Sequence, residues 1–166
     1  MPITLSSVSL PVFQTALSNL LHCLNKAEAN AAARKFDPNV FVTMRLAPDM
    51  LPFAAQIRIA CDAAKNGTAR LAGIEAPKFD DNETTFAELQ ARVRKTLDWL
   101  ATVPASAIDG REAAEITFPV GRDKTRTMTG EAYLKHWALP NLFFHVTTAY
   151  ALLRHSGVDL GKVDYL

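Results

Sequence analysis

Three polar side chains recur along one stripe of the last helical segment, where they could take part in acid–base or metal chemistry. Asn141 and His145 lie four residues apart, and Thr148 follows three residues later. Side chains at these spacings project from the same face of an α-helix, one turn after another. An imidazole beside an amide and a hydroxyl is the arrangement that a helix-borne metal site or a general acid–base site requires.

The second predicted helix supplies candidate partners for these groups. Asp49 and Gln56 lie on one flank of its apolar stripe, which places a carboxylate and an amide within reach of the centre of the molecule. Asp62 falls on the far side of this helix, where we expect it to be solvated. A buried polar group without a partner costs about 1–3 kcal/mol, so the polar groups of the last helix must meet one another, these partners, water or a ligand.

A purely structural role explains the same residues. A single histidine on an apolar stripe is more often a core histidine, hydrogen-bonded to a carbonyl or hydroxyl, than a metal ligand. Asn141 directly follows Pro140, so its side chain could bind backbone donors that a break in the helix sets free. The residues alone leave both interpretations open.

The cysteines and the other histidines give weaker evidence for a site. Cys61 falls on an apolar stripe, where a thiol is inert packing, and Cys23 borders its stripe without a base beside it. His22 and His136 lie on outer faces, and His155 lies near the C-terminus of the last helix. The chain also lacks an HExxH zinc motif, a phosphate-binding glycine loop and a Ser or Cys nucleophile motif, so no common enzyme signature is present.

Four helices are predicted to position these residues. Pro48 precedes the second helix, Thr85 and Glu88 form the pattern of a capping box before the third, and Pro140 is expected to kink or divide the last. Residues 68–82 are expected to form a long connection that covers one end of the fold. The predicted helices span about residues 7–32, 49–67, 86–100 and 129–156.

The period of the apolar residues changes to two between the third and the last helix. Ile116, Phe118 and Val120 alternate with other residues, and a polar run follows at 125–129, which predicts a short β-hairpin. Because each amphipathic helix must be covered by the others, the sequence predicts an all-α fold, a four-helix bundle with this hairpin before the last helix, in a single domain over residues 1–166.

Composition narrows the classes of partner. The 166-residue chain has 18 Lys and Arg against 17 Asp and Glu, so its formal net charge of +1 creates no global field for nucleic acid or an anionic membrane. The first residues lack the form of a secretory signal, no apolar run of about 18 residues could span a bilayer, and the cysteine spacing fits no disulfide framework. We expect a cytoplasmic protein without a nucleic-acid or membrane partner.

The outer side of the last helix is also apolar. Its residues there are Leu139, Phe143, Val146, Tyr150 and Leu153. A helix that is apolar nearly all round is either central or covered by a partner, so the pattern favours a homodimer contact. An interaction module that serves only this contact is one functional alternative.

Several segments resemble a bacterial family of unknown function that is similar to the DinB/YfiT-like superfamily of metalloenzymes. The resemblance covers nearly the whole chain and implies an up-down-down-up four-helix bundle, often dimeric, in which three histidines hold a divalent metal. One histidine comes from the second helix, here near Gln56, and two come from an HxxxH pair, here Asn141 and His145. The segments that carry the resemblance are 49–50, 56–57, 61–65, 140–150, 153–157 and 160–166.

Two functions follow from these expectations. In the first, the bundle keeps a central pocket with a degenerate or absent metal site and binds a small molecule through His145, Asn141, Thr148 and Gln56. The alternative is a divalent-metal-dependent transferase or hydrolase acting on a small, thiol-linked substrate, with zinc or nickel held by His145, Gln56 and Asp49 and completed by water. Amide oxygens bind these metals far less firmly than imidazole does, which favours the first.

Overall fold

Helices make up most of the protein, whose computed structural model describes residues 3–166. Residues 1–2, which belong to the segment considered for a secretory signal, lie outside the described residues. The long helices are α1 (Leu10–Ala33), α2 (Phe53–Ala72), α3 (Phe86–Leu100) and α5 (Leu139–His155), with α4 (Gly130–Tyr133) and the π-helical segment η3 (Leu134–Ala138) leading directly into α5. The smaller elements are η1 (Pro38–Phe41), η2 (Ala105–Ala107), β1 (Glu115–Val120), β2 (Lys124–Thr129) and α6 (Lys162–Tyr165).

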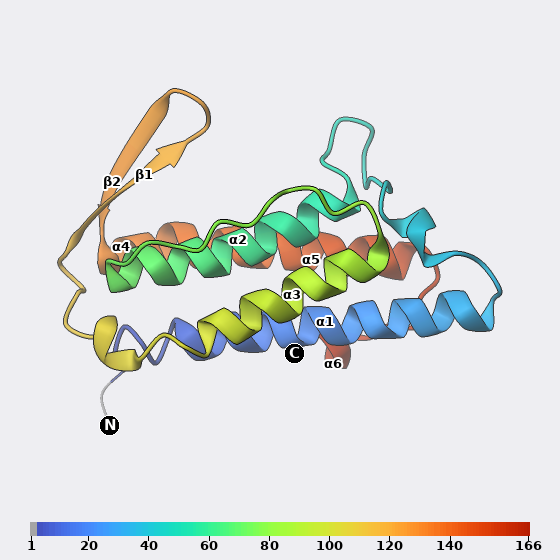
Figure 1. The fold of residues 1–166 in the computed structure, drawn as a ribbon, viewed down its shortest axis with the longest axis horizontal. Coiled ribbons are helices and arrows are strands. Elements are labelled where there is room, and N and C mark those ends of the chain that lie inside the picture. Colours follow the sequence, from blue (N-terminus) through green and yellow to red (C-terminus); the bar gives the residue numbers. More distant parts are fainter. Residues whose placement is uncertain (1–2) are drawn as a thin grey trace.

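The long helices pack side by side around a shared apolar core (Figure 1). Helix α2 contacts α5 and α3, and α1 contacts α3 and α5. Figure 1 shows α2 and α3 running in one direction, opposite to α1 and α5, with a long connection returning along α2 to the start of α3. The predicted combination of a mostly helical fold with one small antiparallel sheet is therefore confirmed. Of the helices in the described part of the chain, none has the length and hydrophobicity that a membrane crossing requires.

Local sequence signals fix the start of α3 as predicted. The Thr85 side chain accepts a hydrogen bond from the Glu88 backbone N–H at 3.3 Å, and the Glu88 carboxylate accepts one from the Thr85 backbone N–H at 2.8 Å. This reciprocal arrangement satisfies two backbone donors that the helix itself leaves unpaired.

Helix α2 differs from the prediction at both ends. It begins at Phe53, after Pro52 rather than Pro48, and it continues past Asn66 and Gly67 to Ala72. A Cβ on Gly67 would lie 3.2 Å from the Phe13 ring, so this glycine brings α2 close to α1 instead of ending the helix. The stop comes at Gly73, whose φ of 67° is left-handed.

The last helical region is divided beside Pro140, in line with the prediction, although the chain stays helical on both sides of the division. The irregularity lies just before this proline, in η3, where the Leu139 backbone N–H bonds to the Leu134 carbonyl across the wider turn of a π-helix. Pro140 then falls in the first turn of α5, and that helix runs without interruption to His155. A single widened turn thus accommodates a proline that has no N–H to donate.

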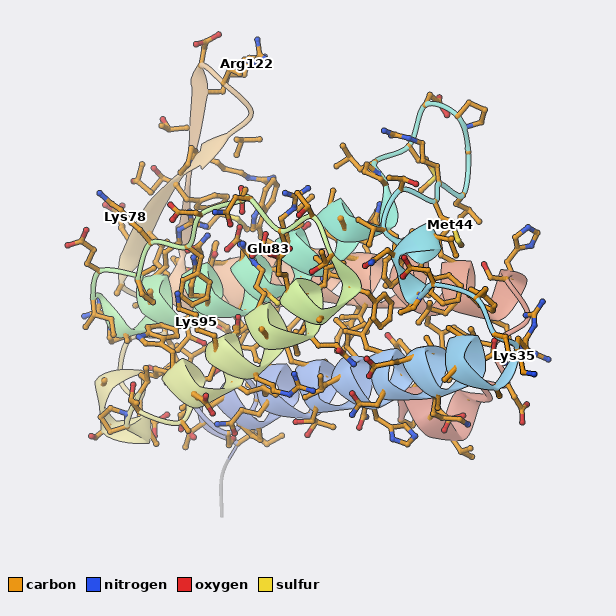
Figure 2. The ribbon with its side chains drawn as sticks, turned by 45° about the vertical axis from the view of Figure 1, so that its right-hand side comes forward. Lys35, Met44, Lys78, Glu83, Lys95 and Arg122 are labelled. Atoms are coloured by element: carbon orange, nitrogen blue, oxygen red, sulfur yellow. The ribbon has the colours of Figure 1, made fainter. Side chains whose placement is uncertain are left out.

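The hairpin forms where the alternating apolar residues predict it. Strand β1 pairs antiparallel with β2, and Ile116 lies opposite Met128. Phe118 is buried, with its ring centroid 4.9 Å from that of Tyr133. Arg122 lies at the tip of the hairpin, away from the helices (Figure 2).

One buried arginine, Arg92, binds the connection between α2 and α3. The Arg92 side chain is only 2% exposed, and its guanidinium donates to Glu83 at 2.8 Å and to the Asp80 carbonyl at 3.0 Å. It also forms an ion pair with Asp81 at 3.0 Å. Figure 2 shows Glu83 where the connection passes over the helices. The connection therefore lies along α2 and α3, whereas the sequence predicted that it covers one end of the fold.

Asp62 takes part in the same cluster, so the expectation that it is simply solvated was wrong. Its Oδ1 lies 3.1 Å from Arg92 and 3.0 Å from the buried Lys65. We call Arg92, Lys65, Asp62, Asp81 and Glu83 the Arg92 network. These charges are paired across three segments because a buried charge without a partner is strongly unfavourable.

Replacing Arg92 by methionine tests this network. We expect the free energy of unfolding, measured by urea denaturation, to fall by about 3 kcal/mol, because the variant leaves carboxylates without their cation. The value is at the low end of the range for buried pairs because Asp81 is 64% exposed. The control is Arg94→Met on the exposed face of α3, which should change stability by less than about 0.5 kcal/mol. Equal losses in the two variants would contradict the assigned role.

Candidate functional site

The antiparallel contact between α2 and α5 brings together most of the residues that the sequence singled out. We call this contact, extended through η3 and α4, the α2–α5 seam. Its polar residues are Gln56, Asp62, Asn66 and Arg70 from α2 and Tyr133, Asn141 and His145 from α4 and α5. Because the helices run in opposite directions, Gln56 at the start of α2 meets His145 within α5, and Arg70 near the end of α2 meets Tyr133.

Gln56 and His145 form a buried pair at one end of the seam. The His145 Nδ1 and the Gln56 Oε1 are 2.7 Å apart, and the two residues are 8% and 1% exposed. The Gln56 Nε2 donates to the Leu51 carbonyl at 3.0 Å, which can only accept, so the amide oxygen must face the imidazole. His145 therefore carries its proton on Nδ1 and keeps a lone pair on Nε2.

The surroundings of His145 favour its neutral form. Burial lowers the pKa of His145 because the charged imidazolium would lose its hydration. The Phe144 ring stands edge-on to the imidazole, with the ring centroids 5.1 Å apart. The pair thus acts as a neutral, hydrogen-bonded link between the two helices.

Among the described residues, neither Thr148 nor Asp49 forms a hydrogen bond with this pair. The Thr148 hydroxyl donates to the Phe144 carbonyl at 2.7 Å, so its proton is used within α5. Asp49 is exposed in the loop before α2, and its predicted place on the second helix was wrong. The helix starts late because the backbone N–H of Phe53 donates to the Met44 carbonyl, which ties this stretch into a turn.

The residues present do not fit a zinc or nickel centre. The described residues contain no group of three or more His, Cys, Asp or Glu side chains that could hold a metal ion. The seam offers a single imidazole, and the Gln56 oxygen beside it already accepts the Nδ1 proton. Zinc and nickel sites in proteins rely on several imidazole or thiolate ligands, and this donor set falls short of that.

The two thiols are also unsuited to chemistry. Burial raises the pKa of Cys61 to about 12 and that of Cys23 to about 11, so both stay protonated at neutral pH. For Cys61 this agrees with its interpretation as a packing residue.

Asn141 lines a small polar pocket farther along the seam, which we call the Asn141 pocket. It has a volume of about 80 Å³, far below the roughly 300–1,000 Å³ of sites for drug-sized ligands. A ligand with few non-hydrogen atoms, or the end of a larger one, is what such a space admits. Its lining residues are Ile59, Asp62, Ala63, Asn66, Arg70, Tyr133, Trp137, Ala138 and Asn141.

Sequence reasoning missed Asn66, Arg70 and Tyr133 as site residues. Asp62, Asn66 and Arg70 follow one another at intervals of four, a helical row visible in the sequence. The row was overlooked because the helix was predicted to end at Asn66 and Gly67, before Arg70. Tyr133 carried no such signal, since its place depends on how α4 and η3 pack against α2.

The polar groups of the pocket are only partly paired. Arg70 donates to the Tyr133 hydroxyl at 3.0 Å, and its guanidinium carbon lies 5.4 Å from the centroid of the Phe118 ring. Burial raises the pKa of Tyr133, so the hydroxyl stays neutral. The hydrogen bonds along the seam use Gln56, His145, Arg70, Tyr133 and Thr148, and the side chains of Asn66 and Asn141 take part in none of them.

Comparisons with known proteins agree with this structure. Residues 5–166 match the family described as "Domain of unknown function (DUF1993)". The solved structure of a DinB family member protein from Shewanella denitrificans is 42% identical, with a TM-score of 0.88, over 98% of this chain and 91% of that chain. No curated protein matches the sequence. The resemblance to a DinB-like family of unknown function is therefore confirmed.

The neutral state of His145 predicts a pH dependence of stability. Because its pKa is lower in the folded protein than the ordinary 6.5, the unfolded chain takes up a proton first as the pH falls. The contribution of neutral His145 is therefore complete above about pH 6.5 and declines below it. We expect the stability advantage of the wild type over His145→Gln, measured by urea denaturation, to shrink between about pH 7.5 and 5.5.

The exposed His136 provides the control for this measurement. The loss of the advantage over His145→Gln should exceed any change in the difference between the wild type and His136→Gln over the same range. An advantage at position 145 that stayed constant would show that the folded protein does not favour the neutral imidazole, and one that grew on acidification would show that it favours the charged form; either result would contradict the assigned protonation state.

Proposed function

The chain belongs to the DUF1993 family, and from this membership and the α2–α5 seam we propose that it binds a small polar molecule in the Asn141 pocket. The observation that carries the proposal is the convergence of polar groups that the protein leaves available. The amides of Asn66 and Asn141 border the pocket beside Arg70 and Asp62. Few, convergent polar groups in a concave site are what orient a small ligand.

The buried pair next to the pocket has a supporting role in this proposal. The bond between Gln56 and His145 fixes how α2 and α5 face each other, and Asn141 lies one turn before His145 on the same helix. His145 still has the lone pair on Nε2, through which it could accept a proton from a ligand that extends along the seam. Gln56 would then act by holding α2 and α5 in place, whereas the Thr148 hydroxyl is bound within α5.

We also infer the up-down-down-up four-helix bundle of the DinB-like proteins as the topology. The directions of α1, α2, α3 and α5 and their mutual contacts support it. The long connection between α2 and α3 explains how two consecutive helices run the same way, because a short loop would force them antiparallel.

The metal-dependent transferase or hydrolase is the less well supported alternative. It needs His145, Gln56 and Asp49 as ligands, but Asp49 is exposed outside α2 and Gln56 is committed to Leu51 and His145. A ligand set of one imidazole would depend on neutral oxygen donors that hold zinc and nickel weakly. We therefore derive no step through a metal.

Binding at Asn141 is testable with a library of small polar compounds. We expect at least one compound to shift the side-chain amide signals of Asn66 and Asn141 in ¹H–¹⁵N spectra of the labelled protein. Asn141→Leu should abolish the shifts at Asn66, because leucine fills the pocket without offering a hydrogen bond. The exposed Asn82 amide serves as the control for nonspecific effects. Shifts that survive unchanged in Asn141→Leu would place the ligand elsewhere and contradict the proposal.

We further propose that the exposed part of α5 contacts a second copy of the chain. The predicted face is only partly available, because Val146 and Leu153 are buried within the protein. Phe143 and Phe144 remain 39% and 56% exposed, and adjacent aromatic side chains at this exposure favour an apolar contact.

Light scattering of Phe143→Asp tests this contact. We expect the wild type to have the mass of a dimer and the variant that of a monomer, since a carboxylate cannot be desolvated there without a partner. Val163→Asp, at an 88% exposed position on α6, is the matched control and should remain dimeric. A wild type that is monomeric at high concentration would refute the contact.

A further inference from the structure

The charges around the Asn141 pocket are unevenly compensated, beginning with Arg70. None of the ion pairs among the described residues includes Arg70. Its partners are the neutral hydroxyl of Tyr133 and the aromatic faces of Phe118 and Tyr133. A half-buried guanidinium that lines a pocket and has no carboxylate within ion-pair distance is a preferred place for an anionic group, which it can bind through two parallel N–H groups.

Asp62 places a negative charge at another point of the same pocket. Within the Arg92 network, Asp62 pairs with the cations Lys65 and Arg92. Both cations that contact Asp62 do so at Oδ1, which leaves Oδ2 available as an acceptor. Asp62 is the member of the network that lines the pocket, where its Oδ2 is a negatively charged acceptor.

The opposite charges of Arg70 and Asp62 line the same pocket. Asp62 and Arg70 are separated by two turns of α2, and Asn66 lies between them on the same row. Asn66 and Asn141 can each donate and accept hydrogen bonds, so they suit the neutral middle of a ligand. A ligand with one charge of either sign would leave the other end of the pocket uncompensated.

From this distribution we infer that the ligand is a small zwitterion, with a carboxylate held by Arg70 and an ammonium group held by Asp62. The inference rests on the proposed function, since it names the class of molecule that the Asn141 pocket takes. The pocket volume of about 80 Å³ restricts the class to short amino acids or to the amino-acid end of a larger molecule. An amino acid of this kind would pair with both Arg70 and Asp62 in a single binding event.

A series of probes tests the inference. The amino acids glycine, β-alanine and 4-aminobutanoate are titrated into the labelled protein, beside the matched acids acetate, propanoate and butanoate and the amines methylamine, ethylamine and propylamine. We expect one amino acid of the series to shift the Asn66 and Asn141 side-chain amides with at least about tenfold higher affinity than its matched acid and amine, because it gains one further charge-assisted hydrogen bond. The preferred length reports the spacing of the two charges.

Two pairs of variants assign the charges. Arg70→Gln should reduce the affinity for the best amino acid to that of the matched amine, whereas Arg70→Lys should retain part of it. Asp62→Asn should reduce the affinity to that of the matched acid. Asp81→Asn is its control, because Asp81 contacts Arg92 outside the pocket. Circular dichroism and the melting temperature establish that each variant is folded before binding is compared.

The outcomes separate this inference from the proposed function. If singly charged or neutral probes bind as tightly as every amino acid, or if Arg70→Gln leaves the preference unchanged, the zwitterion is overturned while binding at Asn141 stands. If neither these probes nor the wider library of polar compounds shifts the Asn66 and Asn141 amides, both the inference and the proposed function fail.

Discussion

The packing of α2 against α5 is the constraint on which the site depends. Polar residues lie along both helices, and each must find a partner once the helices are in contact. Gln56 meets this demand at one end by binding the Leu51 carbonyl and the His145 imidazole together. Farther along the seam the side chains of Asn66 and Asn141 take part in no such pairing, and there a small pocket opens. At one end of this contact the polar side chains are therefore paired within the protein, and at the other end they are available to a ligand.

Much of the fold follows from local signals in the sequence. Three signals were sufficient to predict the helices and the hairpin: the capping box at Thr85, the alternation from Ile116 to Val120 and the apolar stripes of the helices. Each depends on interactions between residues that are close in the sequence. The start of α2 was not predictable from Pro48, since Pro52 and the tertiary hydrogen bond from Phe53 to Met44 set it. The ion pairing of Asp62 was equally hidden, because its partner Arg92 comes from α3.

The candidate site was predictable only in part for the same reason. Helical spacing placed Asn141 and His145 on one face of α5 and named Gln56 as a partner, which the 2.7 Å bond to His145 matches. Which residue of α2 lies opposite which residue of α5 depends on their packing, so Arg70 and Tyr133 could not be assigned to the pocket. The widened turn at η3, which leads into Asn141, had no recognisable signature beyond Pro140.

The central claim is that Gln56 and His145, two positions at which the sequence resemblance implied metal ligands, form a neutral, hydrogen-bonded pair. The most direct test is a long-range ¹H–¹⁵N spectrum of the His145 imidazole at neutral pH, recorded before and after addition of zinc. We predict a proton on Nδ1, a bare Nε2 and no change on adding the metal. A proton on Nε2, a doubly protonated ring, or a stoichiometric shift of either nitrogen with zinc would contradict the account.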